Sequence, residues 1–131
     1  MKAFLVDLEN KPGELARIAE AIAKQGINME GVSGTTCDQS GRVAIVTKDD
    51  ACTRTALGVA NLTFKEMEAT EVSLRHEPGS LAKAARRLAD AGVNVEAIFP
   101  TGMQGQDVTV AFVTDQPAKA KEALAEVALK S

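Results

Sequence analysis

The stretch that decides the fold is Asn10-Lys11-Pro12-Gly13, which lies between an alternating apolar run and an amphipathic segment. Before it, Phe4, Val6 and Leu8 fall on one face of an extended segment, which predicts a half-buried strand. After it, apolar residues recur with the spacing of a helix that packs on one side. They are Leu15, Ile18, Ala19, Ile22 and Ala23. The four residues therefore predict a strand-to-helix turn.

The same pattern returns 66 positions later, at His76-Glu77-Pro78-Gly79. Between residues 9–32 and residues 75–98, nine of the 24 aligned positions are identical. The first-copy members are Pro12, Gly13, Leu15, Ala16, Ala19, Ala23, Gly26, Asn28 and Glu30. Gly26 and Gly92 each follow a predicted helix, at a position typical of a left-handed helix end. We therefore expect two copies of one unit, residues 1–66 and residues 67–131.

Each copy predicts the order strand, helix, strand, strand, helix. The second and third strands are expected at 27–33 and 42–47, and again at 93–99 and 108–114 with the same loop length. The last helix of the first copy is capped by Asp49 or Asp50 and ends near Asn61. The last helix of the second copy begins near Pro117 and runs toward Lys130. This order is typical of the ferredoxin-like βαββαβ unit, an α+β fold with an antiparallel or mixed sheet and helices on one face.

The segment 63–75 contains no Gly or Pro. We expect it to be one long strand shared between the copies, the fourth strand of the first and the first strand of the second. The fourth strand of the second copy is then missing at the C-terminus. An unpaired sheet edge favours pairing with another chain, so we expect a homodimer.

The composition argues against several classes of partner. The 131 residues are 45% hydrophobic and 25% charged, with a formal net charge of -3. Basic residues form no stripe of the kind that nucleic acids require. The sequence contains neither a signal peptide nor a run of about 18 apolar residues, so we expect a cytoplasmic protein without membrane contact. Cys37 and Cys52 lack metal-ligand spacing, and we interpret them as free thiols.

The turn has the chemistry of a small anion site. Proline gives up an N–H that a helix start leaves unpaired, and glycine lets the backbone bend. The exposed first amides and the helix dipole suit a carboxylate. Asn10 adds a donor and an acceptor, and Asn28, with its counterpart Asn94, adds a second amide. A zwitterionic amino acid would satisfy this set. Alternatively, Asn10 only stabilises a turn, and Asn28 and Asn94 only connect elements.

The loop, together with the helix exit Gly26-Ile27-Asn28-Met29-Glu30, resembles the ACT domain, a βαββαβ regulatory module attached to many enzymes of amino acid metabolism. His76-Glu77-Pro78-Gly79-Ser80-Leu81 with Gly92-Val93-Asn94-Val95-Glu96 resembles a second copy. The resemblance implies that a free amino acid binds between two modules, through the loop of one and the second-strand start of its neighbour. The residues implied are Asn10, Pro12, Gly13, Asn28, His76, Pro78, Gly79 and Asn94.

The chain also departs from this family. Serine-biosynthesis dehydrogenases of the family carry a histidine two positions before the loop asparagine, where this chain has Leu8 and Leu74, which argues against serine as the ligand. His76 replaces the second loop asparagine; it either contacts a ligand, with a charge that changes near neutral pH, or is a plain turn residue. Glu30 and Glu96 either select a cationic side chain or form a solvated strand face.

We expect no enzyme and no cofactor, because the sequence contains no nucleophile elbow, P-loop or metal-ligand cluster. The first hypothesis is an allosteric, regulatory amino-acid-binding protein. An alternative is a regulatory subunit of a larger amino-acid-biosynthetic enzyme, since the first copy resembles the start of an acetolactate synthase small subunit. A third hypothesis is a purely structural interaction module.

Overall fold

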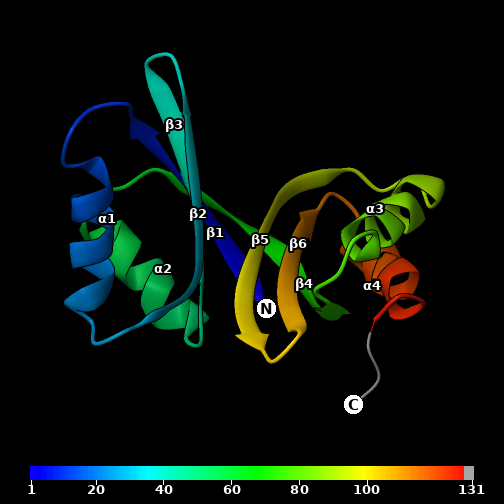
Figure 1. Cartoon of the computed structure of the whole chain (residues 1–131). Helices are drawn as coiled ribbons and strands as arrows, with labels where there is room; N and C mark the ends of the chain where they lie inside the picture. Colours follow the sequence, from blue (N-terminus) through cyan, green and yellow to red (C-terminus); the bar gives the residue numbers. More distant parts are fainter. Residues whose placement is uncertain (129–131) are drawn as a thin grey trace. The chain divides into compact units, whose positions relative to one another are not determined.

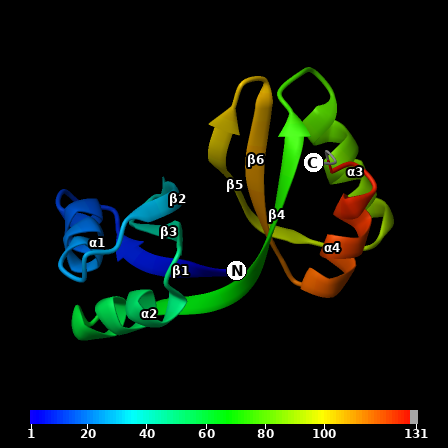
Figure 2. The ribbon, with the colours of Figure 1, turned by 90° about the horizontal axis from the view of Figure 1, so that it is seen from below.

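The structure is a computed structural model that describes residues 1–128. The chain forms two compact units, each built from strands and helices (Figures 1 and 2). We call residues 2–67 the N-terminal unit, and Met1 together with the residues from Glu68 onward the C-terminal unit. In the described part of the chain, no helix is long and apolar enough to cross a membrane.

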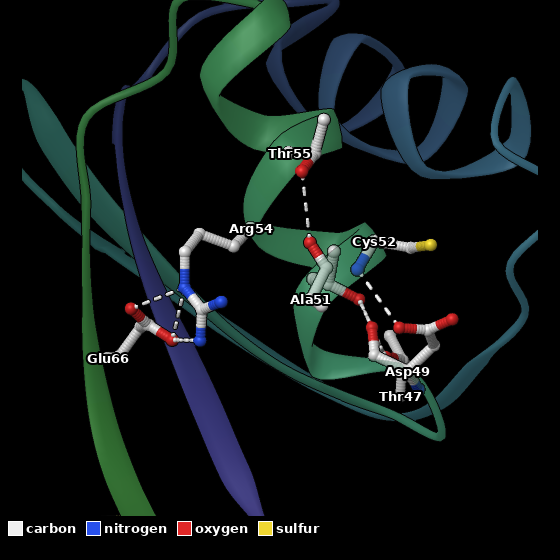
Figure 3. A network of polar contacts seen from close by, with 8 residues as sticks. Thr47, Asp49, Ala51, Cys52, Arg54, Thr55 and Glu66 are labelled. Carbon is white, nitrogen blue, oxygen red and sulfur yellow. Dashed lines mark hydrogen bonds and ion pairs between the residues drawn. The ribbon is translucent and has the colours of Figure 1, made fainter.

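The N-terminal unit contains β1 (Lys2–Glu9), α1 (Glu14–Ala23), β2 (Met29–Cys37), β3 (Ser40–Thr47) and α2 (Asp50–Val59). Strand β3 lies between β1 and β2 and is antiparallel to both. The Asp7 N–H donates to the Thr63 carbonyl oxygen at 2.9 Å, which places the chain entering β4 beside β1. Asp49 is the N-cap of α2, as predicted, and its carboxylate accepts the Cys52 N–H at 3.0 Å (Figure 3).

The C-terminal unit continues from β4 (Phe64–Arg75) through α3 (Ser80–Asp90), β5 (Val95–Gln104), β6 (Asp107–Thr114) and α4 (Pro117–Ala125). Strand β6 lies between β4 and β5 and is antiparallel to both. The order β4-β6-β5 therefore matches the order β1-β3-β2 of the N-terminal unit. Up to Ala128, no strand follows α4. The sequence predicts that the last helix runs toward Lys130. This predicted end lies outside the part of the chain that the structure describes.

In each unit the two helices cover one face of the strands and enclose a core (Figure 1). The N-terminal core consists of Phe4, Val6, Ile18, Ile22, Val43, Ile45, Ala56 and Leu57. The C-terminal core consists of Val72, Leu74, Ala84, Leu88, Val93, Val110, Phe112, Ala120 and Leu124. These apolar faces stabilise the units because they remove hydrocarbon surface from water.

The buried stripe of each first helix is narrower than the sequence predicts. Leu15 and Leu81, which we expected on the buried face, are 58% and 51% exposed. Each lies in the first turn of its helix, where the neighbouring space is an open pocket and not the core. Ile18 and Ile22 in α1 are buried, as predicted.

The loops between the second and third strands have equal lengths in the two copies, as predicted, but β5 contains one residue more than β2. Leu8 lies opposite Gly41, whereas Leu74, 66 positions after Leu8, lies opposite Val108, 67 positions after Gly41. The extra residue is accommodated in β5, where the register shifts between Pro100 and Gly102. A β-bulge absorbs one residue in this way without reversing the faces of the rest of the strand.

Strands β2 and β5 also end later than the sequence predicts. They reach Cys37 and Gln104, beyond the expected ends at 33 and 99, because both remain paired with β3 and β6 up to a two-residue turn. The polar residues 35–37, which we expected in a loop, belong to this paired hairpin.

Candidate functional site

A pocket lies beside the strand-to-helix turn of each unit. The N-terminal pocket, of about 450 Å³, is lined by Leu8, Glu9, Asn10, Lys11, Glu14, Leu15, Val32, Ser33, Gly34, Thr35, Thr36 and Val43. The C-terminal pocket, of about 410 Å³, is lined by Leu74, Arg75, His76, Glu77, Ser80, Leu81, Ile98, Phe99, Pro100, Val108 and Val110. Each pocket lies between the turn, the start of the following helix and the next strand of the same unit. The two therefore occupy equivalent places.

The turn glycines adopt the backbone conformation that the sequence predicted for a bend. Gly13 and Gly79 are the N-caps of α1 and α3, with φ angles of 92° and 91°, a region that favours glycine. Neither helix has a side-chain cap, so no capping side chain competes for the first-turn N–H groups. Pro12 and Pro78 are exposed and line neither pocket.

Asn10 lines the N-terminal pocket, but one of its two side-chain amide hydrogens is already bonded. Its side-chain NH₂ donates to the Asp38 carbonyl oxygen at 2.8 Å, and its backbone N–H donates to the Gln39 carbonyl oxygen at 2.9 Å. Both acceptors belong to the turn between β2 and β3. Asn10 therefore ties the loop to this hairpin, and its side-chain oxygen and second amide hydrogen are left for a ligand.

His76 occupies the corresponding place in the C-terminal pocket and is held by its backbone. Its N–H donates to the Gln106 carbonyl oxygen at 2.6 Å, in the turn between β5 and β6. The imidazole is exposed and lines the pocket. Unlike the side chain of Asn10, it makes no hydrogen bond to another described residue, so both ring nitrogens are accessible to a ligand.

Asn28 and Asn94 line neither pocket. Asn28 precedes β2, whereas the pocket residues of that strand begin at Val32. Asn94 is engaged through its backbone, since its N–H donates to Asp115 Oδ1 at 3.0 Å and its carbonyl oxygen accepts the Asp115 N–H at 3.2 Å. Within one unit, the structure does not bring Asn28 to Asn10 or Asn94 to His76. A site that combines a loop residue with Asn28 or Asn94 requires a neighbouring module, and this site stays a prediction.

Glu14 is a site residue that the sequence reasoning missed. It is only 9% exposed, although it is charged and begins α1. One carboxylate oxygen accepts the Glu9 N–H at 3.2 Å, and the other lies 3.5 Å from an Arg17 guanidinium nitrogen. An acidic residue in the first turn of a helix is the signal that would have indicated it, because such a side chain folds back toward the loop. The corresponding residue in the C-terminal unit is Ser80.

The charges on the two loops are reversed in sign. In the N-terminal loop, Lys11 Nζ lies 2.9 Å from a Glu9 carboxylate oxygen. This hydrogen-bonded ion pair lowers the pKa of Glu9 and raises the pKa of Lys11. In the C-terminal loop, Arg75 Nε lies 4.0 Å from Asp107, and the Glu77 carboxylate has no partner among residues 1–128. The first loop is therefore internally paired and the second is not.

The remaining candidates contribute no further site. Glu30 lies 3.6 Å from Lys48 Nζ, which fits a salt-bridged strand face, and neither Glu30 nor Glu96 lines a loop pocket. Both cysteines are free, as predicted. Across the described residues, no group of three His, Cys, Asp or Glu side chains is arranged to hold a metal ion. A cavity of about 510 Å³ between β4 and α4 contains none of the predicted site residues.

The six antiparallel strands and four helices define an α+β, ACT-like fold. Solved structures share it along nearly the whole chain. A Bacteroides thetaiotaomicron protein matches with a TM-score of 0.82 and 25% identity, over 95% of this chain and 86% of that one. The regulatory subunit of aspartate kinase from Thermus thermophilus matches with a TM-score of 0.66 and 20% identity, over 96% and 91%.

The regulatory subunit of aspartate kinase from Thermus flavus is similar as well, with a TM-score of 0.63 and 18% identity over 96% of this chain and 90% of that one. No family model matches the chain, and the curated proteins contain no match. The comparisons therefore show the fold.

Proposed function

We propose that this chain is a regulatory, non-enzymatic protein made of two ACT-type modules, which binds a free amino acid at its strand-to-helix turns. The observation that carries this function is the pair of pockets at equivalent places in the two units. Small-molecule sites are concave, largely apolar and edged by a few polar groups, and both pockets fit that description. The fold shared with regulatory subunits of aspartate kinase supports the same function.

In this proposal, the two turns hold the ligand. The side chains of Asn10 and His76 contact it, and Pro12, Gly13, Pro78 and Gly79 shape the turns that expose the first helical N–H groups to it. Asn28 and Asn94 reach a ligand from a neighbouring module, and so require an interface between modules. Strands β2 and β5 are edge strands, each paired in its own unit on one side only. Edge strands favour pairing with another chain, and on this ground we propose a homodimer.

The function is tested by thermal melting against each of the twenty amino acids at millimolar concentration. A ligand at 100 times its dissociation constant stabilises the folded state by about 2.7 kcal/mol, so the melting temperature should rise for at least one amino acid. If a folded sample shows no rise with any of them, amino-acid binding is wrong.

The interface is tested by Asn94→Ala. Asn94 lies outside both pockets and uses backbone atoms to hold Asp115, so its truncation should leave the fold intact. Loss of the ligand-induced shift in this variant supports a site completed by a neighbouring module. An unchanged shift places the whole site within one unit.

A second candidate is a regulatory subunit of a larger amino-acid-biosynthetic enzyme. It is favoured by the similarity to subunits of aspartate kinase that cover the length of this chain and little more. The ligand would then change the affinity of the chain for its catalytic partner by the factor that linkage allows. Affinity purification of the full chain from its native cells distinguishes the two, since only this candidate predicts a stoichiometric catalytic subunit.

A further inference from the structure

The two pockets differ in their walls. Strand β2 lines the N-terminal pocket with five consecutive residues, which are Val32, Ser33, Gly34, Thr35 and Thr36. The C-terminal pocket has Ile98, Phe99 and Pro100 at the positions of β5 that correspond to the first three of these, and no threonine. The wall of the C-terminal pocket is therefore almost entirely hydrocarbon. Its deep side adjoins the C-terminal core, since Leu74 and Val110 belong to both.

The pockets also differ in what already occupies their polar ends. Glu14 places a mostly buried carboxylate at the start of α1, where a ligand carboxylate would otherwise approach. Two like charges at this place repel each other. Ser80, at the same place in the C-terminal unit, is neutral, so the first turn of α3 contributes no carboxylate to its pocket.

The charged side chains of the two loops also differ in how fully they are paired. In the N-terminal pocket, Glu9 and Lys11 neutralise each other at 2.9 Å. In the C-terminal pocket, the Arg75 guanidinium is held only at 4.0 Å by Asp107, and Glu77 is unpaired within residues 1–128. One positive and one negative group beside an apolar wall match the three parts of an amino acid, which are its carboxylate, its ammonium group and its side chain.

From these differences we infer that the C-terminal pocket is the binding site, and that its ligand is an amino acid with a bulky apolar side chain, branched or aromatic. This inference rests on the proposed function and specifies it. Arg75 pairs with the ligand carboxylate and Glu77 with its ammonium group. The ligand side chain packs between Leu81 and Ile98, which are 51% and 40% exposed and would become covered.

The test is isothermal titration of the full chain with leucine, isoleucine and phenylalanine on one side, and serine, aspartate and lysine on the other. We expect binding of the apolar group only. Leu81→Ser removes one wall of the C-terminal pocket and should weaken binding about tenfold or more. Leu15→Ser tests the other pocket, because Leu15 has the same place in α1 and similar exposure, and it weakens binding only if the ligand occupies the N-terminal pocket. Val59→Ser, at an exposed site outside both pockets, is the control and should leave the affinity unchanged.

A third variant tests the polar end. Ser80→Glu introduces the acidic residue of the N-terminal loop into the C-terminal one and should abolish binding, while Ser80→Ala should retain it. If only polar amino acids bind, or if Leu15→Ser weakens binding and Leu81→Ser does not, the inference is overturned and the proposed function stands. If none of the twenty amino acids binds, both are overturned.

Discussion

The two units place different partners around the same buried hydroxyl group. In the N-terminal unit, the hydroxyl oxygens of Thr47 and Thr53 lie 2.6 Å apart, and each also lies within 3.2 Å of the Asp49 carbonyl oxygen. Thr114 corresponds to Thr47 in the C-terminal unit, but Ala120 stands in place of Thr53. Among the described residues, the buried Thr114 hydroxyl has no hydrogen-bond partner. The same fold therefore tolerates an unsatisfied polar group in one unit that it satisfies in the other.

The units also place their core aromatic ring on different strands. Phe4 of β1 lies opposite Ile45 of β3, whereas Thr70 of β4 lies opposite Phe112 of β6. Both rings are buried, with 0% and 1% exposure. The comparison indicates that this layer of the core accepts its aromatic ring from either strand of the cross-strand pair.

The largest expected effect is the loss of either ring. Phe4→Ala and Phe112→Ala should each lower the free energy of unfolding by about 3–5 kcal/mol, because a fully buried ring leaves a cavity. Urea unfolding measures the loss. Val59→Ala, at a site 77% exposed, is the control and should change stability by less than about 0.5 kcal/mol. A difference of several kcal/mol between the two phenylalanines would show that the units do not depend equally on their rings.

A swap sharpens this comparison. Phe4→Thr combined with Ile45→Phe gives the N-terminal unit the arrangement seen at Thr70 and Phe112. The double variant should be more stable than Phe4→Thr alone. If the double variant is no more stable than Phe4→Thr alone, the N-terminal core accepts the ring only from β1.

The threonine pair should give effects of opposite sign. Thr114→Val removes an unsatisfied buried hydroxyl with little change of shape and should raise the free energy of unfolding by about 1 kcal/mol. Thr47→Val removes the partner of Thr53 and should lower it by about 1–3 kcal/mol. Differential scanning calorimetry compares the two, and two destabilised variants would contradict the assignment of Thr114 as unsatisfied.

Acid sensitivity should arise in the N-terminal unit. Arg54 forms a two-nitrogen contact with the Glu66 carboxylate, with Nη2 at 2.6 Å from Oε1 and Nε at 2.9 Å from Oε2, while its counterpart in the C-terminal unit is Lys121 (Figure 3). The hydrogen-bonded guanidinium lowers the pKa of Glu66. The pair therefore contributes its full stability above the unfolded glutamate pKa, about 4.3, and loses it as the pH falls through the lower folded pKa.

Glu66→Gln should accordingly reduce the dependence of unfolding free energy on pH between about pH 5 and pH 3. Arg54→Gln should produce the same change, and the double variant should add nothing further. Additive effects of the two substitutions would contradict a direct contact between them.

The smallest effect concerns the reactivity of the two exposed cysteines. The hydrogen bond and negative charge of Asp49 raise the pKa of the Cys52 thiol. Asp49→Asn keeps an N-cap acceptor for α2 but removes the charge, so Cys52 should react faster with iodoacetamide near pH 8. Cys37 in the same sample is the internal reference, and mass spectrometry of the two peptides measures both rates. An unchanged ratio of the two rates would contradict the role of Asp49.

Local rules predicted most of the fold. Gly26 and Gly92 end their helices with φ angles of 71° and 72°, as their position after an apolar stripe indicated. The order of elements followed in the same way from hydrophobic period. These features depend on residues close in sequence, and a single sequence displays them directly.

The site could be predicted only in part, because its decisive contacts join distant residues. The two turns were found, but the bond from Asn10 to Asp38 spans 28 positions and depends on how the hairpin folds back. The burial of Glu14 and the exposure of Leu15 depend on the space beside the next strand, which helical period does not describe. For the same reason, the local sequence does not display the pocket walls, which favour the loop with His76.

The bulge between Pro100 and Gly102 has a consequence for the engineering of this chain. A one-residue insertion in a regular strand moves its buried side chains to the solvent face, yet β5 contains one extra residue relative to β2 and still keeps Phe99 buried. This edge strand is thus a natural site for changes in length. Short insertions or labels placed at Thr101 should be accommodated, whereas the same insertions in the central strands β3 and β6 should prevent folding.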